Sequence, residues 1–399
     1  MRATFRVIPV LLVAMSLVLL SLPPRVQSVP LYAARTGLMC QSCHFDPNGG
    51  GPRNEFGFGF AKNRHLLTPE DTTSRWANLD LTNRVGETMP LYFGVNQRFM
   101  LLANQHRSSD NLERLAFFNM ESELHLAFQP HSMLTLVYTL DGFATSPINT
   151  VRSKEAYGMI RGLPGDAYVR AGRFRVPFGL RMDDHTVATR AGYGDFGTGG
   201  AFLPYDPRFP DMGIEVGGDH NGWFGRAAFT NGQASALTNN GHAEAKTIKL
   251  GYDMPYFQGA VSLYDDFIKS GTTPTTRLTR WGFHGLTHYQ RFAAIGELAA
   301  GTDEDKTTTI KTNLLAAFGE LDWSPRREYN MRVRYDYQSL DRGATQPVHD
   351  ANVYSRYSLE GEWVPVPFAE IRWALRYLDP KDPLQDIERQ AFLQFHFSY

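Results

Sequence analysis

The fold class of this chain is decided by a stretch of eight residues, Met331–Gln338, which reads MRVRYDYQ. Apolar or aromatic side chains alternate there with charged or polar ones. This period of two is typical of a β-strand with one apolar and one polar face. The same alternation recurs in 118–128, 353–363 and 370–377.

The polar face of these strands carries full charges in window after window. In 118–128 the alternation predicts Phe118, Met120 and Leu124 on the apolar face, opposite Glu121 and Glu123. Charges facing one way and apolar side chains the other suit a barrel with a wet interior and a lipid-covered exterior. A sheet in a soluble β-sandwich pair would alternate as well, and this is the alternative.

The connections between the strands alternate in length. Short turns are predicted at 129–132, 163–166, 218–222, 255–259, 289–292, 324–329 and 365–368, and longer links near 105–112, 142–154, 175–210, 232–244, 269–275, 300–306, 340–351 and 379–387. Short turns on one side and long loops on the other are typical of outer-membrane barrels. The sequence therefore predicts an all-β fold, a transmembrane antiparallel β-barrel of about 16 strands, over residues 85–399 with both chain ends on the periplasmic side.

Composition limits the class of protein. The chain has 399 residues, a net charge of −1, two cysteines and a mean hydropathy of −0.33. The low hydropathy excludes a helical membrane bundle, because each helical span needs about 20 apolar residues, whereas barrel strands average out polar. The balanced charge argues against a nucleic-acid partner, and two cysteines are too few for a disulfide scaffold.

Residues 1–28 have the layout of a secretory signal peptide. Arg2 and Arg6 give a basic start, an apolar run follows at Val7–Leu22, and Ser28 lies near the predicted cleavage site. The alternative is an uncleaved membrane anchor, although the run is shorter than a bilayer span. Export places the mature chain outside the cytoplasm, where c-type haem attachment also occurs.

Cys40-Gln41-Ser42-Cys43-His44 matches the attachment motif of a c-type haem. Each thiol can bond a haem vinyl group, and the imidazole of His44 can bind the iron as an axial ligand. A dithiol redox pair would need a βαβ context, and a zinc site would need a second ligand pair. Since Cys40 and Cys43 are the chain's two cysteines, the motif predicts one covalent haem c.

The second axial ligand of the haem iron has two candidates. His65 lies 21 residues beyond His44, and Met89 is the other candidate. A solvated loop histidine is the alternative interpretation of His65. The haem segment with its linker, residues 29–84, is too short to bury a haem by itself. We therefore expect the barrel to wall in the haem, with this segment plugging the lumen.

The longest predicted connection, 175–210, is expected to fold inward and narrow the pore. A barrel of sixteen strands encloses a lumen wide enough for such a loop. The loop contains Asp183-Asp184-His185, which could hold a metal ion, and the alternative is a solvated polar loop.

The order of parts carries a resemblance to a known family. A signal peptide, then Ala34-Arg35-Thr36-Gly37 leading into Cys40–His44, and then a porin-like barrel resemble the fused monohaem cytochrome–porins of the bacterial outer membrane. Known members of that family oxidise ferrous iron outside the cell. The resemblance implies that the two cysteines attach the haem and that His44 binds its iron.

Together these features predict an outer-membrane electron conduit. It would pass electrons between an extracellular donor or acceptor, ferrous iron by the resemblance, and a periplasmic carrier such as a cytochrome c. One alternative is a diffusion porin whose haem segment is a regulatory or docking module, and another is a soluble periplasmic haem sensor. No nucleophile–base pair or carboxylate pair stands out, so the sequence implies no bond-making catalysis.

Overall fold

The computed structural model describes residues 31–36, 38–66, 80–106, 114–142, 152–184, 186–190, 210–232, 244–254, 256–270, 273–326, 328–343, 353–381 and 388–399. The predicted signal peptide lies outside these residues. In the described part, three short helices, α2 (Leu31–Thr36), α3 (Cys40–Cys43) and α4 (Glu55–Lys62), precede the strands. None of them is long and apolar enough to cross a membrane.

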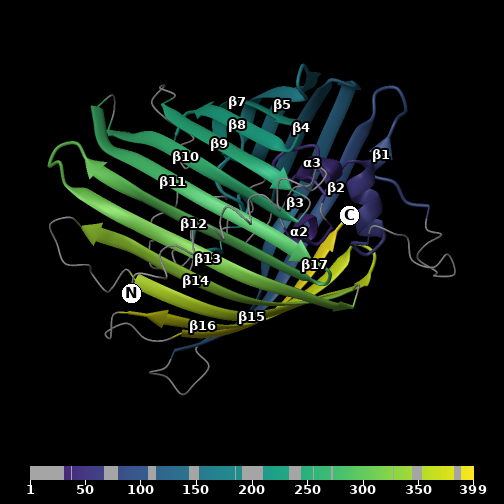
Figure 1. The fold of residues 1–399 in the computed structure, drawn as a ribbon. Helices are drawn as coiled ribbons and strands as arrows, with labels where there is room; N and C mark the ends of the chain where they lie inside the picture. Colours follow the sequence, from purple (N-terminus) through teal and green to yellow (C-terminus); the bar gives the residue numbers. More distant parts are fainter. Residues whose placement is uncertain are drawn as a thin grey trace, which may run out of the picture.

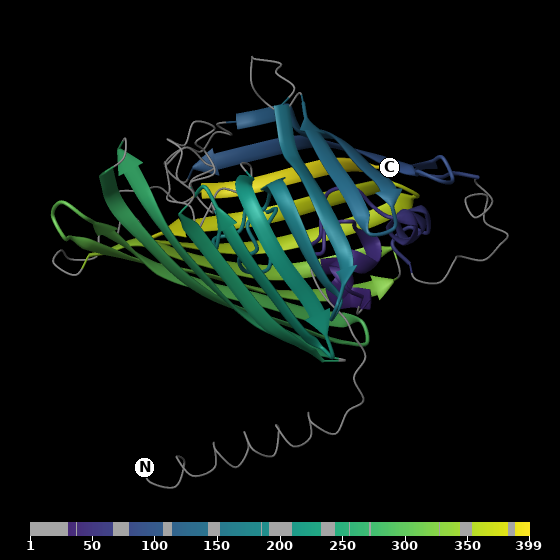
Figure 2. The same cartoon turned by 90° about the horizontal axis from the view of Figure 1, so that it is seen from above.

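The strands form one closed antiparallel barrel (Figures 1 and 2). A two-residue strand, β1 (Arg84–Val85), leads into sixteen long ones: β2 (Leu91–His106), β3 (Arg114–His131), β4 (Leu134–Asp141), β5 (Arg152–Leu163), β6 (Ala167–Phe174), β7 (Asp211–His220), β8 (Trp223–Thr230), β9 (Ala245–Met254), β10 (Phe257–Ser270), β11 (Thr273–Tyr289), β12 (Phe292–Asp305), β13 (Lys311–Arg326), β14 (Tyr329–Gly343), β15 (Val353–Val366), β16 (Ala369–Pro380) and β17 (Glu388–Ser398). Neighbours in the chain pair with one another, and β17 pairs with β2. This closure confirms the sixteen-strand barrel and excludes the sandwich.

Each of the seven predicted short turns overlaps a connection between consecutive strands, although 129–132 is placed too early, because β3 extends to His131 and β4 begins at Leu134. Two predicted long links are wrong. At 269–275, β10 extends to Ser270 and β11 begins at Thr273, and at 300–306, β12 extends to Asp305 and the link begins after it. The end of β12 is polar, which made it resemble a loop. It nevertheless pairs on both sides, with Asp305 opposite Thr276 of β11 and Glu304 opposite Lys311 of β13.

The two faces of the barrel wall differ as predicted. On β14, the outward Val333 is 51% exposed, whereas the inward Arg334 is 4% exposed and forms an ion pair with Glu320 of β13. Most of the exposed large apolar side chains belong to the outward positions of successive strands, where a lipid bilayer would cover them. Such a face in water would be an apolar patch far larger than soluble proteins tolerate.

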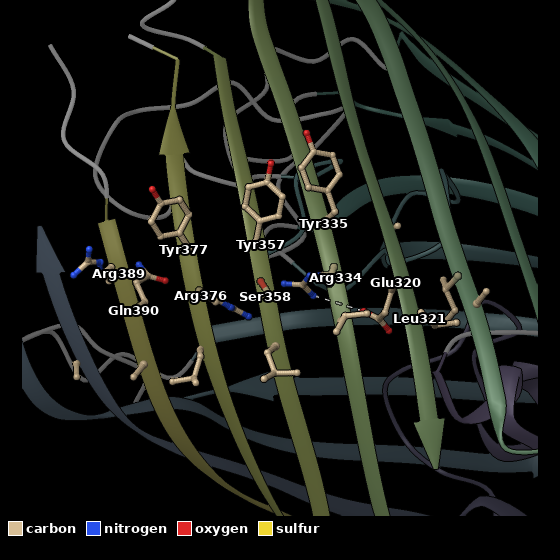
Figure 3. Close-up of a pocket in the computed structure, with 18 of the residues that line it drawn as sticks. Glu320, Leu321, Arg334, Tyr335, Tyr357, Ser358, Arg376, Tyr377, Arg389 and Gln390 are labelled. Atoms are coloured by element: carbon tan, nitrogen blue, oxygen red, sulfur yellow. Dashed lines mark ion pairs between the residues drawn. The ribbon is translucent and has the colours of Figure 1, made fainter. Parts of the chain in front are cut away.

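A row of tyrosines marks one level of the outward face. Figure 3 shows Tyr335, Tyr357 and Tyr377 side by side on β14, β15 and β16, where they are cross-strand partners. They border a shallow outward groove of about 1060 Å³ that contains no residue of the N-terminal helices. Aromatic side chains at one level of a barrel wall are typical of the membrane–water interface.

The predicted face of β3 is wrong at its start. A register shift in the pairing of β2 with β3 leaves Met120 as an extra residue in β3. Phe118 and Met120 therefore line the lumen together with Glu121, whereas Phe117 and Leu124 are exposed outside. A β-bulge of this kind reverses the faces of all residues on one side of it.

The long connection after β6 folds into the lumen over the described residues 175–184 and 186–190, as predicted. The backbone N–H of Leu180 donates to Glu297 of β12 at 2.8 Å, and that of Ala188 donates to Asp336 of β14 at 3.1 Å. Between them, Arg181 pairs with Glu320 at 2.6 Å. This inward loop is thus fixed against the charged inner wall, and it narrows the channel.

Candidate functional site

The chain's first described residues, 31–36 and 38–66, form an N-terminal segment that lies inside one end of the barrel. Figures 1 and 2 show its helices at the same end as the C-terminus. Arg35 pairs with Glu362 of β15 at 3.0 Å, and Asp46 pairs with Arg170 of β6 at 2.6 Å. Because both partners are inward side chains of the wall, the segment is held within the lumen by buried charges.

Helix α4 fixes the position of the Cys-x-x-Cys turn. Its N-cap residue Asn54 accepts a hydrogen bond from the N–H of Gly57 at 2.9 Å and donates to the carbonyl of Ser42 at 3.0 Å. A Cβ at Gly57 would overlap the carbonyl oxygen of Cys43. Only glycine therefore allows α4 to pack so closely on α3.

Both cysteines lie on the single turn α3, and they do not form a disulfide with each other. Burial raises the pKa of the Cys43 thiol. Cys40 is buried beneath Gly49, which has a φ of +87° and where a Cβ would come 3.1 Å from the Cys40 sulfur. The backbone at Gly49 thus packs closely against the first cysteine.

The structure brings His44 and His65 to one cavity. Burial, with a smaller contribution from the Arg53 charge, lowers the pKa of His44 to about 4 and that of His65 to about 3. Both imidazoles are therefore neutral near pH 7, which is the form that binds metals. Among the described residues, the buried Nδ1 atoms of His44 and His65 have no hydrogen-bond partner.

The backbone at the end of α4 turns His65 back toward the segment. His65 has a φ of +61°, and its N–H donates to the carbonyl of Phe60 at 2.9 Å. Its ring lies 4.2 Å from that of Tyr32 and 5.5 Å from that of Phe60, measured between centroids. His65 is therefore a packed residue of the segment and not a solvated loop histidine.

The cavity has a volume of about 790 Å³ and is lined by Cys40, Cys43, His44 and His65 together with the barrel wall. Along β2 its lining runs from Gly94 to Leu102. At about 3.4 Å per residue this corresponds to roughly 27 Å along the strand. The cavity thus extends from the N-terminal segment well into the barrel.

These residues fit a c-type haem. Two thiols lie one helical turn apart, a neutral imidazole follows directly, and a second neutral imidazole shares the cavity. The cavity falls within the usual range of about 300–1,000 Å³ for cofactor sites.

The other predicted ligands lie elsewhere. Met89 is 57% exposed and does not line the cavity. Of the predicted metal loop, Asp184 bonds Arg181 and Thr186, and His185 lies outside the described residues. No group of three or more His, Cys, Asp or Glu residues that could hold a metal ion occurs in the part of the chain that the structure describes.

The barrel wall contributes a histidine that the sequence did not single out. His396 of β17 is 7% exposed and lines the same cavity as His44. Its Nδ1 lies 3.4 Å from Oε2 of Glu370, its cross-strand partner on β16. The alternation of β17 could show that His396 faces inward, but nothing in the local sequence shows that it faces the N-terminal segment.

Comparisons with known proteins bear on the fold. No protein-family model and no curated protein matches the chain. Solved structures do: the anion-selective porin from Comamonas acidovorans (TM-score 0.59, 10% identity, 78% of this chain, 100% of that one), OmpT of Vibrio cholerae (0.58, 10%, 79%, 99%) and the channel DcaP of Acinetobacter baumannii (0.58, 10%, 78%, 98%). All three are outer-membrane proteins or porins by description. At this identity the likeness shows a porin-like barrel fold.

Proposed function

We propose that this chain is an outer-membrane electron conduit in which one covalent haem c sits inside the lumen of the porin-like barrel. The observation that carries the proposal is the position of Cys40, Cys43 and His44, which line a cavity inside the barrel. A bound haem would supply one-electron transfer at its iron. The outward apolar face and the porin-like fold support the outer-membrane location.

The chain's own residues would hold the haem and shield it. The two thiols would bond its vinyl groups, His44 would bind the iron, and His65 is the second ligand predicted from the sequence. Arg98, Arg372 and Arg376 line the cavity and would offset the charge of the haem propionates. The barrel wall would exclude lipid, which a haem on so short a segment could not do alone.

The cavity suggests a different partner on each side of the membrane. Electron tunnelling falls off steeply with distance, and the hydrocarbon layer is about 30 Å thick, so one haem cannot bridge it alone. The N-terminal segment lies at the end of the barrel where short turns connect the strands. A periplasmic carrier such as a cytochrome c would be within reach there. The other partner would be a small solute that enters the lumen past the inward loop. The family resemblance implies ferrous iron in this role.

A diffusion porin with a haem-bearing docking segment is the second candidate. Its support is the similarity of the fold to porins, one of which is described as anion-selective. On the fold alone, this similarity favours the porin over the conduit. A porin would need an open lumen, whereas residues 31–36 and 38–66 and the inward loop occupy it in the structure.

Two measurements separate these functions. For the conduit, proteoliposomes containing the holoprotein should reduce an enclosed acceptor when an external donor is added. The Cys40→Ser/Cys43→Ser variant, which keeps the barrel, should not. A normally reducible haem without any transfer would refute the conduit. A large planar-bilayer conductance that is unchanged when residues 29–84 are deleted would favour the porin.

A further inference from the structure

We propose that His396, on the barrel wall, is the second axial ligand of the haem iron, so that the iron joins the N-terminal segment to strand β17. This inference rests on the proposed haem and names a ligand that the cytochrome motif does not contain. Its evidence is the pair formed by His396 and Glu370, and the short chain of contacts that places this pair beside the segment.

The two ring nitrogens of His396 are bonded as those of a metal-binding histidine would be. Its Nδ1 faces the Glu370 carboxylate at 3.4 Å, while its buried Nε2 has no partner among the described residues. In metal-binding histidines, one ring N–H almost always donates a hydrogen bond to a carboxylate, carbonyl or water. This bond orients the other ring nitrogen toward the metal. His65 lacks such a partner for its buried Nδ1, and its ring packs against Tyr32 and Phe60.

Two chains of contacts place His396 beside the haem motif. His44 forms a β-bridge with Arg53, whose guanidinium donates to the carbonyl and hydroxyl of Ser398 at 2.7 and 3.0 Å. Ser398 is two residues beyond His396 and shares its inward face. On the other side, the Tyr32 hydroxyl donates to Oε2 of Glu370 at 3.3 Å, the oxygen that also faces His396.

Glu370 is a positioning residue in this arrangement. Its second oxygen bonds Arg372, so the carboxylate is held from both sides. The carboxylate would orient the imidazole of His396 and strengthen it as an electron donor to the iron.

The test uses the full-length holoprotein in detergent and the spin state of its ferric haem, read by absorption and electron paramagnetic resonance. His396→Ala should lose the low-spin signal, gain a high-spin one, and recover the low-spin form with added imidazole. His65→Ala should remain low-spin. His125→Ala is the matched control, because this histidine lines the same cavity but bonds Thr139 and Asn96 through its two ring nitrogens.

Two further variants keep the test informative if His396→Ala does not fold. His396→Met should stay low-spin with a raised reduction potential, since a methionine ligand raises it. Glu370→Gln should stay low-spin with a smaller rise, because a neutral partner weakens the imidazole as a donor. A structural role for either residue would change folding yield but not the potential.

The possible outcomes distinguish a wrong ligand assignment from a wrong proposed function. Loss of the low-spin form in His65→Ala, with His396→Ala unchanged, would overturn the inference. So would a wild-type haem that is already high-spin, and either result would leave the proposed conduit standing. A purified wild-type protein with no covalent haem would overturn the proposed function and the inference together.

Discussion

Replacing Asp46 with asparagine should loosen the N-terminal segment in the lumen without unfolding the barrel. Asp46 accepts a hydrogen bond from Arg170 at 2.6 Å, and the Arg170 side chain is fully buried. Its other oxygen accepts from the N–H of Asn48 at 2.8 Å. The amide oxygen of the D46N variant can keep the bond from Asn48, but its NH2 group then faces the Arg170 guanidinium and cannot accept from it, so the change removes the charged hydrogen bond that joins the segment to β6.

The magnitude follows from what Arg170 retains. It still pairs with Glu215 at 2.8 Å, so the substitution does not leave a buried charge alone. A hydrogen bond to a charged group contributes between about 1.5 and 3 kcal/mol. At about 1.4 kcal/mol per factor of ten, this weakens docking of the segment roughly 10- to 150-fold.

Native-state hydrogen exchange measures this equilibrium. The amides of His44 and Phe58, bonded within the segment, should exchange faster by the same factor, because they are exposed whenever the segment leaves the lumen. Asp219→Asn is the control, since it weakens a comparable pair with Arg226 in the wall, away from the segment. If exchange in the segment is unchanged, or rises equally in the control, the segment is not held by this pair.

Three further predictions test other parts of the structure. Gly57→Ala should lower the yield of haem-loaded protein, since its Cβ would overlap the carbonyl oxygen of Cys43, whereas Gly59→Ala in the same helix has open space and should stabilise it by about 0.5–1 kcal/mol. Val333→Arg should cost about 2–4 kcal/mol in urea unfolding from lipid vesicles if this outward position lies near the bilayer midplane. Gly179→Ala, at a φ of +68° and with its Cβ overlapping a carboxylate oxygen of Glu297, should displace the inward loop and raise single-channel conductance.

Much of the barrel could be predicted from the sequence because two local signals agree along it. Alternation sets the faces, as on β14, where Val333 and Arg334 point to opposite sides. Turn residues set the hairpins, and all seven predicted short turns overlap an actual connection between strands, with 129–132 placed too early. The errors arose where neither the alternation nor the turn residues indicate a change in a strand. The extra residue Met120 follows the adjacent aromatics Phe117 and Phe118, so a change of face left no gap in the apolar pattern.

The candidate site likewise contains residues that the sequence identifies and residues that it does not. Cys40, Cys43 and His44 are adjacent in the chain, and their spacing is itself the signal. The wall residues around them have no such signal. Glu370 and His396 follow the motif by more than 300 residues, and a polar residue at an inward barrel position is ordinary in itself. Their significance comes from what faces them, which only the closed structure reveals.

The register of β17 is therefore part of the site. His396 lies opposite Glu370 on one side and Arg98 on the other, because β17 pairs with both β16 and β2. Side chains alternate between faces, so a slip of one residue would turn His396 to the lipid and bring Phe395 or Phe397 into the lumen. Pairing on both edges prevents such a slip. A haem bound by His44 and His396 would accordingly form only in a correctly closed barrel, which couples loading of the cofactor to folding of the whole wall.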